Sequence, residues 1–142
     1  MPKKITPYIT KDVVSLDENK TVLDAAMEMK VKYIGSIVVT GESGVLGLFT
    51  ERDVTMKVVG KGKDPDLLIL KDYVDKDQVT VSPDEKCSAC LELMKKHRCR
   101  HLLVKDGDQF VGIVTIRGII QLMLEEKEEL IGHLEKYITG SL

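Results

Sequence analysis

Hydrophobic and polar residues alternate along the chain with two different periods, and these periods predict its helices and strands. In Val22–Lys32 the apolar positions recur every three or four residues, which is the spacing of a helix with one buried face. The short apolar runs at 35–39 and 45–49 are typical of strands, and the glycine-containing segment between them predicts an antiparallel hairpin. A strand at 13–16 and a helix at 51–59 complete a unit of five elements.

The same order of elements occurs twice. A shift of 65 positions, without a gap, places Met29 on Met94, Gly47 on Gly112 and Thr50 on Thr115. The second copy therefore predicts strands and helices at 79–81, 87–97, 101–104, 110–114 and from Ile116 onward. Because units of this size do not bury a full core alone, we expect the copies to pack about a pseudo-twofold axis and to leave two related clefts.

The repeat and the glycines after it set the expected domain boundaries. We expect a first repeat at 5–60, a linker at 61–69, a second repeat at 70–124 and a helical extension at 125–142. The last helix of the first repeat should end at Gly60 and turn Val54, Met56 and Val58 toward the core. The segment Ile5–Ile9 should hold the first repeat in place, and Leu70–Val74 is its counterpart.

The most informative stretch is Gly47–Asp53, which reads G-x-x-T-x-x-D between a strand and a helix. Such a junction points backbone N–H groups outward, where they attract an anion, and the Thr50 hydroxyl can add a hydrogen bond to a phosphate. Gly47 lacks a Cβ and would let a ligand approach the backbone, while Asp53 could accept from two ribose hydroxyls. A capping box, in which Thr50 and Asp53 only satisfy the helix N-terminus, explains the same residues.

The two copies together resemble a tandem pair of cystathionine β-synthase (CBS) domains, also called a Bateman module. The resemblance covers nearly the whole chain and rests on the repeat, on the order of the elements, and on Gly47–Asp53, which matches the family's G-h-x-[ST]-x-x-D nucleotide signature. The chain looks most like stand-alone members that are not joined to an enzyme or channel. The resemblance implies an α+β, sandwich-like fold of two β-α-β-β-α repeats with a longer C-terminal helix.

The resemblance also implies a regulatory, non-enzymatic function. An adenosyl ligand, such as AMP, ADP, ATP, NAD(H) or S-adenosylmethionine, would bind between the repeats and change a partner protein by shifting their orientation. Asp53 would hold the ribose and Thr50 the phosphate. The other implied nucleotide-binding residues are Gly47 and Leu48, the adenine contacts Gln78, Val79 and Thr80, and the phosphate contacts Arg100, His101 and Arg117. Ordinary surface charge is the other explanation of these cations.

The two expected clefts are not equal. The second copy has Gly118 where the first has Asp53, and the first copy has Gly35 and Ser36 where the second has Arg100 and His101. The opposite cleft is therefore expected to be weak, empty or suited to an uncharged ligand. The loss of the second aspartate also fits an alternative function, a structural homodimerisation or docking module with a vestigial nucleotide cleft.

Composition narrows the remaining classes of function. The 21 Lys and Arg are interspersed with 23 Asp and Glu, which disfavours duplex nucleic acid as a partner. The sequence has no apolar run near the ~18 residues of a membrane span and no leader, so we expect a cytoplasmic protein without a membrane partner. Three cysteines favour a reducing compartment over disulfides.

Three further features carry chemistry or packing. Cys87, Cys90, Cys99 and His101 superficially have the spacing of zinc ligands, but the repeat places the cysteines at core positions, so we expect no metal. The final helix, Ile116–Ile138, has an interrupted apolar stripe, and its acidic run Glu125–Glu129 should be solvated. The stripe could cap its own core or lie across a second subunit of a homodimer. Gly132 weakens the helix, and Gly140 should end it.

Overall fold

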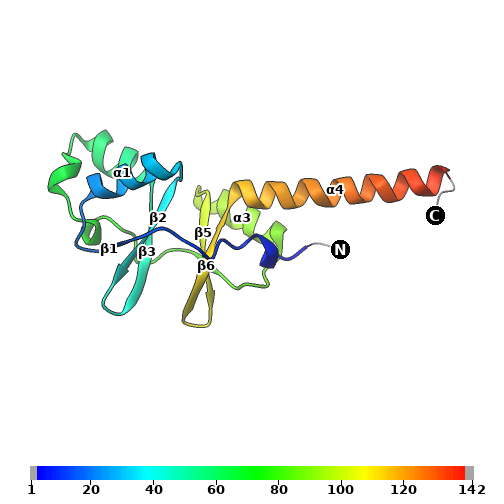
Figure 1. Cartoon of the computed structure of the whole chain (residues 1–142), viewed down its shortest axis with the longest axis horizontal. Helices are drawn as coiled ribbons and strands as arrows, with labels where there is room; N and C mark the ends of the chain where they lie inside the picture. Colours follow the sequence, from blue (N-terminus) through cyan, green and yellow to red (C-terminus); the bar gives the residue numbers. More distant parts are fainter. Residues whose placement is uncertain (1–2, 140–142) are drawn as a thin grey trace. The chain divides into compact units, whose positions relative to one another are not determined.

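The protein folds into two compact units, and the computed structural model describes residues 3–139 (Figure 1). One unit is Asp12–Val79, and the other combines residues 80–139 with residues 3–11. Each contains a three-stranded mixed sheet, in which the middle strand is parallel to one neighbour and antiparallel to the other. The α+β class and the repeated order of elements predicted from the sequence are both confirmed.

The first unit contains β1 (Ser15–Asp17), α1 (Val22–Lys32), β2 (Ser36–Gly41), β3 (Gly44–Thr50) and α2 (Glu51–Asp53). α1 has the bounds that its apolar spacing predicts, and its face with Ala25 and Met29 is buried in the core with Phe49. After α2 the chain continues through a π-helical turn (Val54–Val58) and a 3-10 turn (Val59–Lys61).

The helix after β3 differs from the prediction in two respects. Gly62, with a left-handed φ of 69°, ends the run of helical turns, so the predicted end at Gly60 is wrong. Val58 is buried and Val54 packs against the core, as predicted, but Met56 is exposed. The reason is helical geometry: at about 100° per residue, Met56 lies roughly opposite to Val54 and Val58, which share one side.

The second unit contains β4 (Thr80–Val81), α3 (Cys87–His97), β5 (His101–Asp106), β6 (Gln109–Thr115) and α4 (Ile116–Thr139). α3 again has its predicted bounds. α4 continues through Gly132 without a break, and its predicted end at Gly140 lies outside the described residues. The sequence predicts that the acidic run of α4 is solvated, but the Tyr8 hydroxyl donates to Glu125 and the Lys3 backbone amide donates to Glu126.

Two short segments do not belong to the repeat that directly follows them in the chain. Each is part of the other unit instead. In the second unit, which holds the 3-10 turn Thr6–Tyr8, Thr10 exchanges two backbone hydrogen bonds with Ile113, at 2.8 and 3.0 Å. The 3-10 turns Pro65–Leu67 and Leu70–Asp72 belong to the first unit, where Leu70 is fully buried. The prediction that Ile5–Ile9 holds the first repeat is therefore wrong. The free edge of β6 offers backbone partners that the sequence pattern does not reveal.

Candidate functional site

The junction of β3 and α2 holds the two residues that the sequence motif singles out. The Asp53 amide donates to the Thr50 hydroxyl oxygen at 3.2 Å, and the Thr50 amide donates to Asp53 Oδ2 at 2.9 Å. This reciprocal pair is a capping box, so the structural explanation of these residues holds. It fixes the carboxylate at the helix start without excluding a ligand at its other oxygen, Oδ1.

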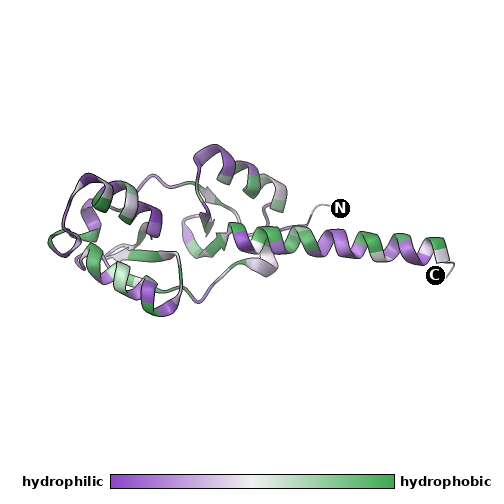
Figure 2. Cartoon of the chain, turned by 90° about the horizontal axis from the view of Figure 1, so that it is seen from above, coloured by the Kyte–Doolittle hydropathy of each residue, from purple (hydrophilic) through white to green (hydrophobic). Residues whose placement is uncertain are grey.

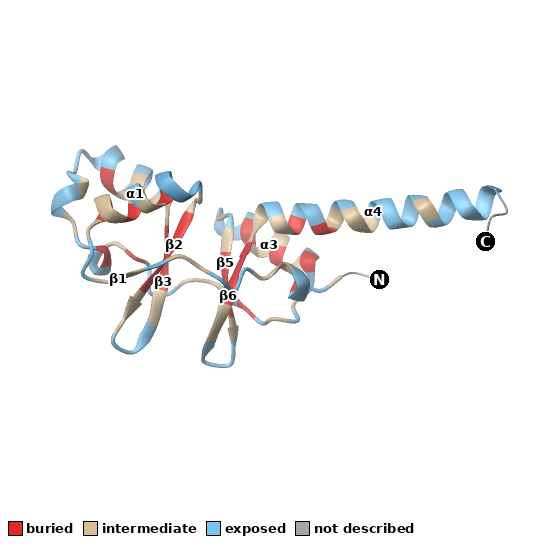
Figure 3. Cartoon of the chain, viewed as in Figure 1, coloured by how far each residue is buried: buried red, intermediate tan, exposed pale blue. Residues whose placement is uncertain are grey.

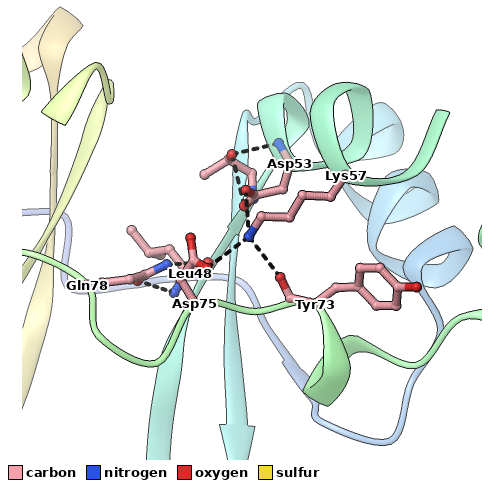
Figure 4. A network of polar contacts seen from close by, with 7 residues as sticks. Leu48, Asp53, Lys57, Tyr73, Asp75 and Gln78 are labelled. Carbon is pink, nitrogen blue, oxygen red and sulfur yellow. Dashed lines mark hydrogen bonds and ion pairs between the residues drawn. The ribbon is translucent and has the colours of Figure 1, made fainter. Parts of the chain in front are cut away.

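A lysine that the sequence motif does not include reaches that second oxygen (Figure 4). Lys57 Nζ lies 3.3 Å from Asp53 Oδ1 and 3.1 Å from Asp75 Oδ1, and it donates to the Tyr73 carbonyl at 3.1 Å. Burial lowers the pKa of Lys57, but the hydrogen bond to Asp75 and the charge of Asp53 outweigh it, so the pKa stays above its ordinary value. Lys57 is therefore a cation that links α2 to the segment after Leu70–Asp72.

The peptide of Leu48, on the free edge of β3, is held by a side chain (Figure 4). Gln78 accepts from the Leu48 amide and donates to the Leu48 carbonyl, both at 2.6 Å. At the neighbouring Gly47, a Cβ would lie only 2.5 Å from the Asp75 carbonyl oxygen. The missing side chain of Gly47 thus makes room for the chain's own backbone, which accounts for the glycine without a ligand.

Fewer backbone amides at the start of α2 are available to bind an anion than the motif suggests. The Glu51 amide donates to the Gly35 carbonyl at 3.1 Å, and the Asp53 amide is taken by the capping box. The Thr50 hydroxyl also lies 3.2 Å from Asp53 Oδ2. An anion at this junction would therefore have to compete with hydrogen bonds already present in the unit.

The remaining candidate residues belong to the second unit. Arg100 and Arg117 are exposed, beside β5 and in the first turn of α4, and His101 pairs with Thr115 across β5 and β6. The Arg100 carbonyl accepts from the Ile116 amide at 2.8 Å, which joins the two locations. The boundary between the units falls after Val79, so Gln78 and Val79 lie with Asp53, while Thr80 lies with these three basic residues.

The cysteines occupy positions that the repeat predicts to be in the core. Cys87 and Cys90 are buried, and Cys99 is half-buried. Burial raises the pKa of Cys90 to about 11, which keeps its thiol protonated at neutral pH. Within residues 3–139, no group of three or more His, Cys, Asp or Glu side chains is arranged to hold a metal ion.

Two α+β repeats with the same order of elements define a tandem module of two related domains. The model of the CBS domain matches residues 5–60 and 70–125, and the chain belongs to this family as a tandem CBS pair. CBS pairs are regulatory modules that often bind nucleotides. In the described part of the chain, no helix has both the length and the apolar character needed to cross a membrane.

Relatives of known sequence or structure agree with this assignment. An uncharacterized protein of Methanopyrus kandleri is 34% identical over 79% of this chain and 58% of its own length. The mitochondrial CBS domain-containing protein CBSX3 of Arabidopsis thaliana is 30% identical over 84% of this chain and 61% of its own length. A crystal structure from Pyrococcus horikoshii superposes with a TM-score of 0.79 at 26% identity, covering 87% and 93% of the two chains. The chain thus spans about three fifths of the two sequence relatives.

Proposed function

We propose that this CBS pair is a non-enzymatic sensor that binds an adenosyl nucleotide with residues of both repeats and thereby regulates a partner protein. Asp53 would accept the ribose hydroxyls, and Thr50, Arg100, His101 and Arg117 would contact the phosphates. AMP, ADP and ATP are the first candidates, followed by NAD(H) and S-adenosylmethionine. The ligand acts by binding one arrangement of the repeats more tightly than another, since only differential affinity shifts such an equilibrium.

The observation that carries this proposal is the pair of hydrogen bonds between Gln78 and the Leu48 peptide. The side-chain amide presents one donor and one acceptor, and the Watson–Crick edge of adenine, with its N6–H and N1, presents the same pair. Leu48 precedes Thr50 by two residues of β3, which is ~7 Å along a strand and about the reach of a nucleoside. In this proposal the base replaces the Gln78 side chain at Leu48 while the ribose reaches Asp53.

The test is a thermal-shift screen of the wild type against AMP, ADP, ATP, NAD, NADH and S-adenosylmethionine. A ligand at about 100 times its dissociation constant should stabilise the fold by roughly 2.7 kcal/mol. Asp53→Ala should abolish this shift. Because that substitution also removes a capping box, the matched control is Asp24→Ala, which removes the equivalent box between Thr21 and Asp24 in α1. The control protein should keep the full ligand shift.

One observation favours the alternative, a structural docking module with a vestigial cleft. The Asp53 carboxylate is already engaged by Thr50 and Lys57, so it has partners without any ligand. No thermal shift with any of the six compounds would support this alternative. An equal loss of ligand shift in Asp53→Ala and Asp24→Ala would also count against a specific role of Asp53 in ribose binding.

A further inference from the structure

The polar contacts of Lys57 lie at the surface of the first unit. Burial in this unit is concentrated in β2, β3 and one face of α1, whereas the helical turns after β3 are mostly exposed or intermediate (Figure 3). These turns mix hydrophilic and hydrophobic residues (Figure 2). The Lys57 side chain is itself partly exposed, so a ligand can reach it from solvent without entering the core.

The Lys57 ammonium group uses its hydrogen-bond donors within its own unit. Its acceptors among residues 3–139 are Asp53 Oδ1 at 3.3 Å, Asp75 Oδ1 at 3.1 Å and the Tyr73 carbonyl at 3.1 Å. Figure 4 shows these acceptors around the Nζ atom. Because an ammonium group has three N–H donors, one of these contacts must open before Lys57 can donate to a ligand.

Asp75 is the contact that opens most easily. Its side chain is 65% exposed, whereas that of Asp53 is 17% exposed, so water can replace Lys57 at Asp75 with little loss of free energy. The Tyr73 carbonyl belongs to a fixed backbone, since the Tyr73 amide donates to the Leu70 carbonyl at 3.0 Å. Rotation of the Asp75 side chain alone therefore frees one donor of Lys57 and leaves its contact with Asp53 in place.

The Asp53 carboxylate has room for one further hydrogen bond. A carboxylate offers about four acceptor sites; Oδ2 accepts from the amide and the hydroxyl of Thr50, and Oδ1 accepts from Lys57. A ribose presents two neighbouring hydroxyls, each of which is both a donor and an acceptor. One hydroxyl can donate to the remaining site of Asp53, and the other then needs a donor. The ammonium group of Lys57 lies beside the same carboxylate and supplies that donor.

We propose that Lys57 is a ribose-binding residue and that the Asp75 carboxylate occupies the place of one ribose hydroxyl until the nucleotide binds. This inference rests on the proposed function and refines it, because Asp53 and Lys57 together recognise the two hydroxyls. On binding, one hydroxyl donates to Asp53, the other accepts from Lys57, and the Asp75 side chain turns to solvent. The Asp75 backbone lies beside β3, since its carbonyl oxygen is only 2.5 Å from where a Cβ of Gly47 would be.

The test is isothermal titration calorimetry of the full chain with AMP, 2′-deoxy-AMP and 3′-deoxy-AMP. In Asp75→Ala no carboxylate competes for the third donor of Lys57, so AMP should bind about threefold more tightly, which is the size expected for a partly exposed ion pair. One deoxy analogue lacks the hydroxyl that accepts from Lys57. That analogue should bind Asp75→Ala as it binds the wild type, whereas the other analogue should bind more tightly, as AMP does.

Loss of negative charge alone would favour all three anionic compounds by the same factor. Asp77→Ala, which removes an exposed acid from the same segment, is the matched control and should change the three affinities equally. In a Lys57→Met background, Asp75→Ala should no longer separate the two analogues. Melting curves confirm that each variant is folded.

The outcomes separate this inference from the proposed function. If Asp75→Ala changed the affinities of all three compounds by one common factor, or changed none of them, Lys57 would not be a ribose contact and the proposed function would stand. A wild type that does not bind AMP would overturn AMP as the ligand of the proposed function and this inference with it.

Discussion

The same location in the two repeats is built in two different ways. Along the free edge of the third strand, the first repeat binds the Leu48 peptide through the Gln78 side chain, whereas the second binds the Ile113 peptide through the Thr10 backbone. A side-chain amide can rotate away, but a backbone pair opens only if the chain itself moves. The edge of the third strand can therefore open by rotation of one side chain in the first repeat, whereas in the second repeat it is closed by backbone.

The two repeats also differ in the charged residues beside this edge, which are present in the first repeat and absent from the equivalent positions of the second. The first repeat has Asp53 and Lys57, and the residues 65 positions later are Gly118 and the fully buried Leu122. A polar network in one repeat is thus replaced by apolar packing in the other. The same framework thus holds polar pairing at this position in one repeat and apolar packing in the other.

The largest change in stability should come from placing a lysine at Leu122, the position in the second repeat that is equivalent to Lys57. Leu122→Lys places an ammonium group in the core without carboxylate partners, and should destabilise the fold by at least ~3 kcal/mol. The reverse change, Lys57→Leu, should cost within ~1 kcal/mol, because Lys57 is partly solvated and its pairing is a modest contribution. Urea unfolding of both variants measures the difference. Equal costs would show that the two locations are not distinct environments.

The next effect tests what the repeats share. A Cβ at Gly47 would overlap the Asp75 carbonyl, and a Cβ at Gly112 would overlap the Thr10 carbonyl. Gly47→Ala and Gly112→Ala should therefore each destabilise by about 1–3 kcal/mol through overpacking. Gly132→Ala, where a Cβ meets nothing within 4 Å, is the control and should be neutral or slightly stabilising. If Gly47→Ala alone were tolerated, the segment at Asp75 would be free to move aside.

A third prediction concerns the edge of β3 at Leu48, which the Gln78 side chain occupies. If adenine must displace the Gln78 side chain from Leu48, Gln78→Ala should tighten nucleotide binding by about tenfold, because two neutral hydrogen bonds no longer have to be broken. Isothermal titration calorimetry with the ligand identified by the thermal-shift screen measures the change. Gln109→Ala, an exposed glutamine of the second unit, is the control. Weaker binding in Gln78→Ala would instead make its side chain a direct contact of the ligand.

The sequence predicts the local elements well because their signals are local. α1 and α3 have the bounds expected from apolar spacing, and Thr21 caps α1 through its contact with Asp24. Contacts between distant segments leave no such periodic signal. The packing of Thr10 on β6, and of Asp75 beside β3, joins residues whose separation in the chain hides their contact.

The sequence predicts the candidate site only in part, because the same residue types fit two explanations. Thr50 and Asp53 satisfy a capping box and a nucleotide signature with the same atoms, so the residue types cannot separate the two. Lys57 could have been found from its position four residues after Asp53, which is ion-pair spacing on a helix. The role of Gln78 could not, because nothing in its neighbours indicates that its amide reaches the Leu48 peptide.

A smaller effect concerns the cap of α1 and depends on pH. The hydrogen bond from the Thr21 backbone, followed by that from its side chain, lowers the pKa of Asp24 below its ordinary value of 3.8. The contribution of this carboxylate is therefore complete above pH 3.8 and is lost as the pH falls through the lower folded-state pKa. Asp24→Ala should cost ~1 kcal/mol at pH 7 and less at pH 2.5, measured by urea unfolding. A constant difference would exclude the ionised cap.

The smallest effect should come from giving the second repeat the cap that only the first possesses. Lys86, the counterpart of Thr21, is the N-cap residue of α3 and makes no side-chain cap, although its φ of −76° and ψ of 141° suit a capping residue. Lys86→Ser should stabilise the protein by ~0.5–1 kcal/mol, because the hydroxyl can accept from an amide of the first turn. Lys86→Ala separates this gain from loss of the lysine. If Ser and Ala had equal effects, the backbone of α3 would differ from that of α1 at its start, and the structural equivalence of the two repeats would end there.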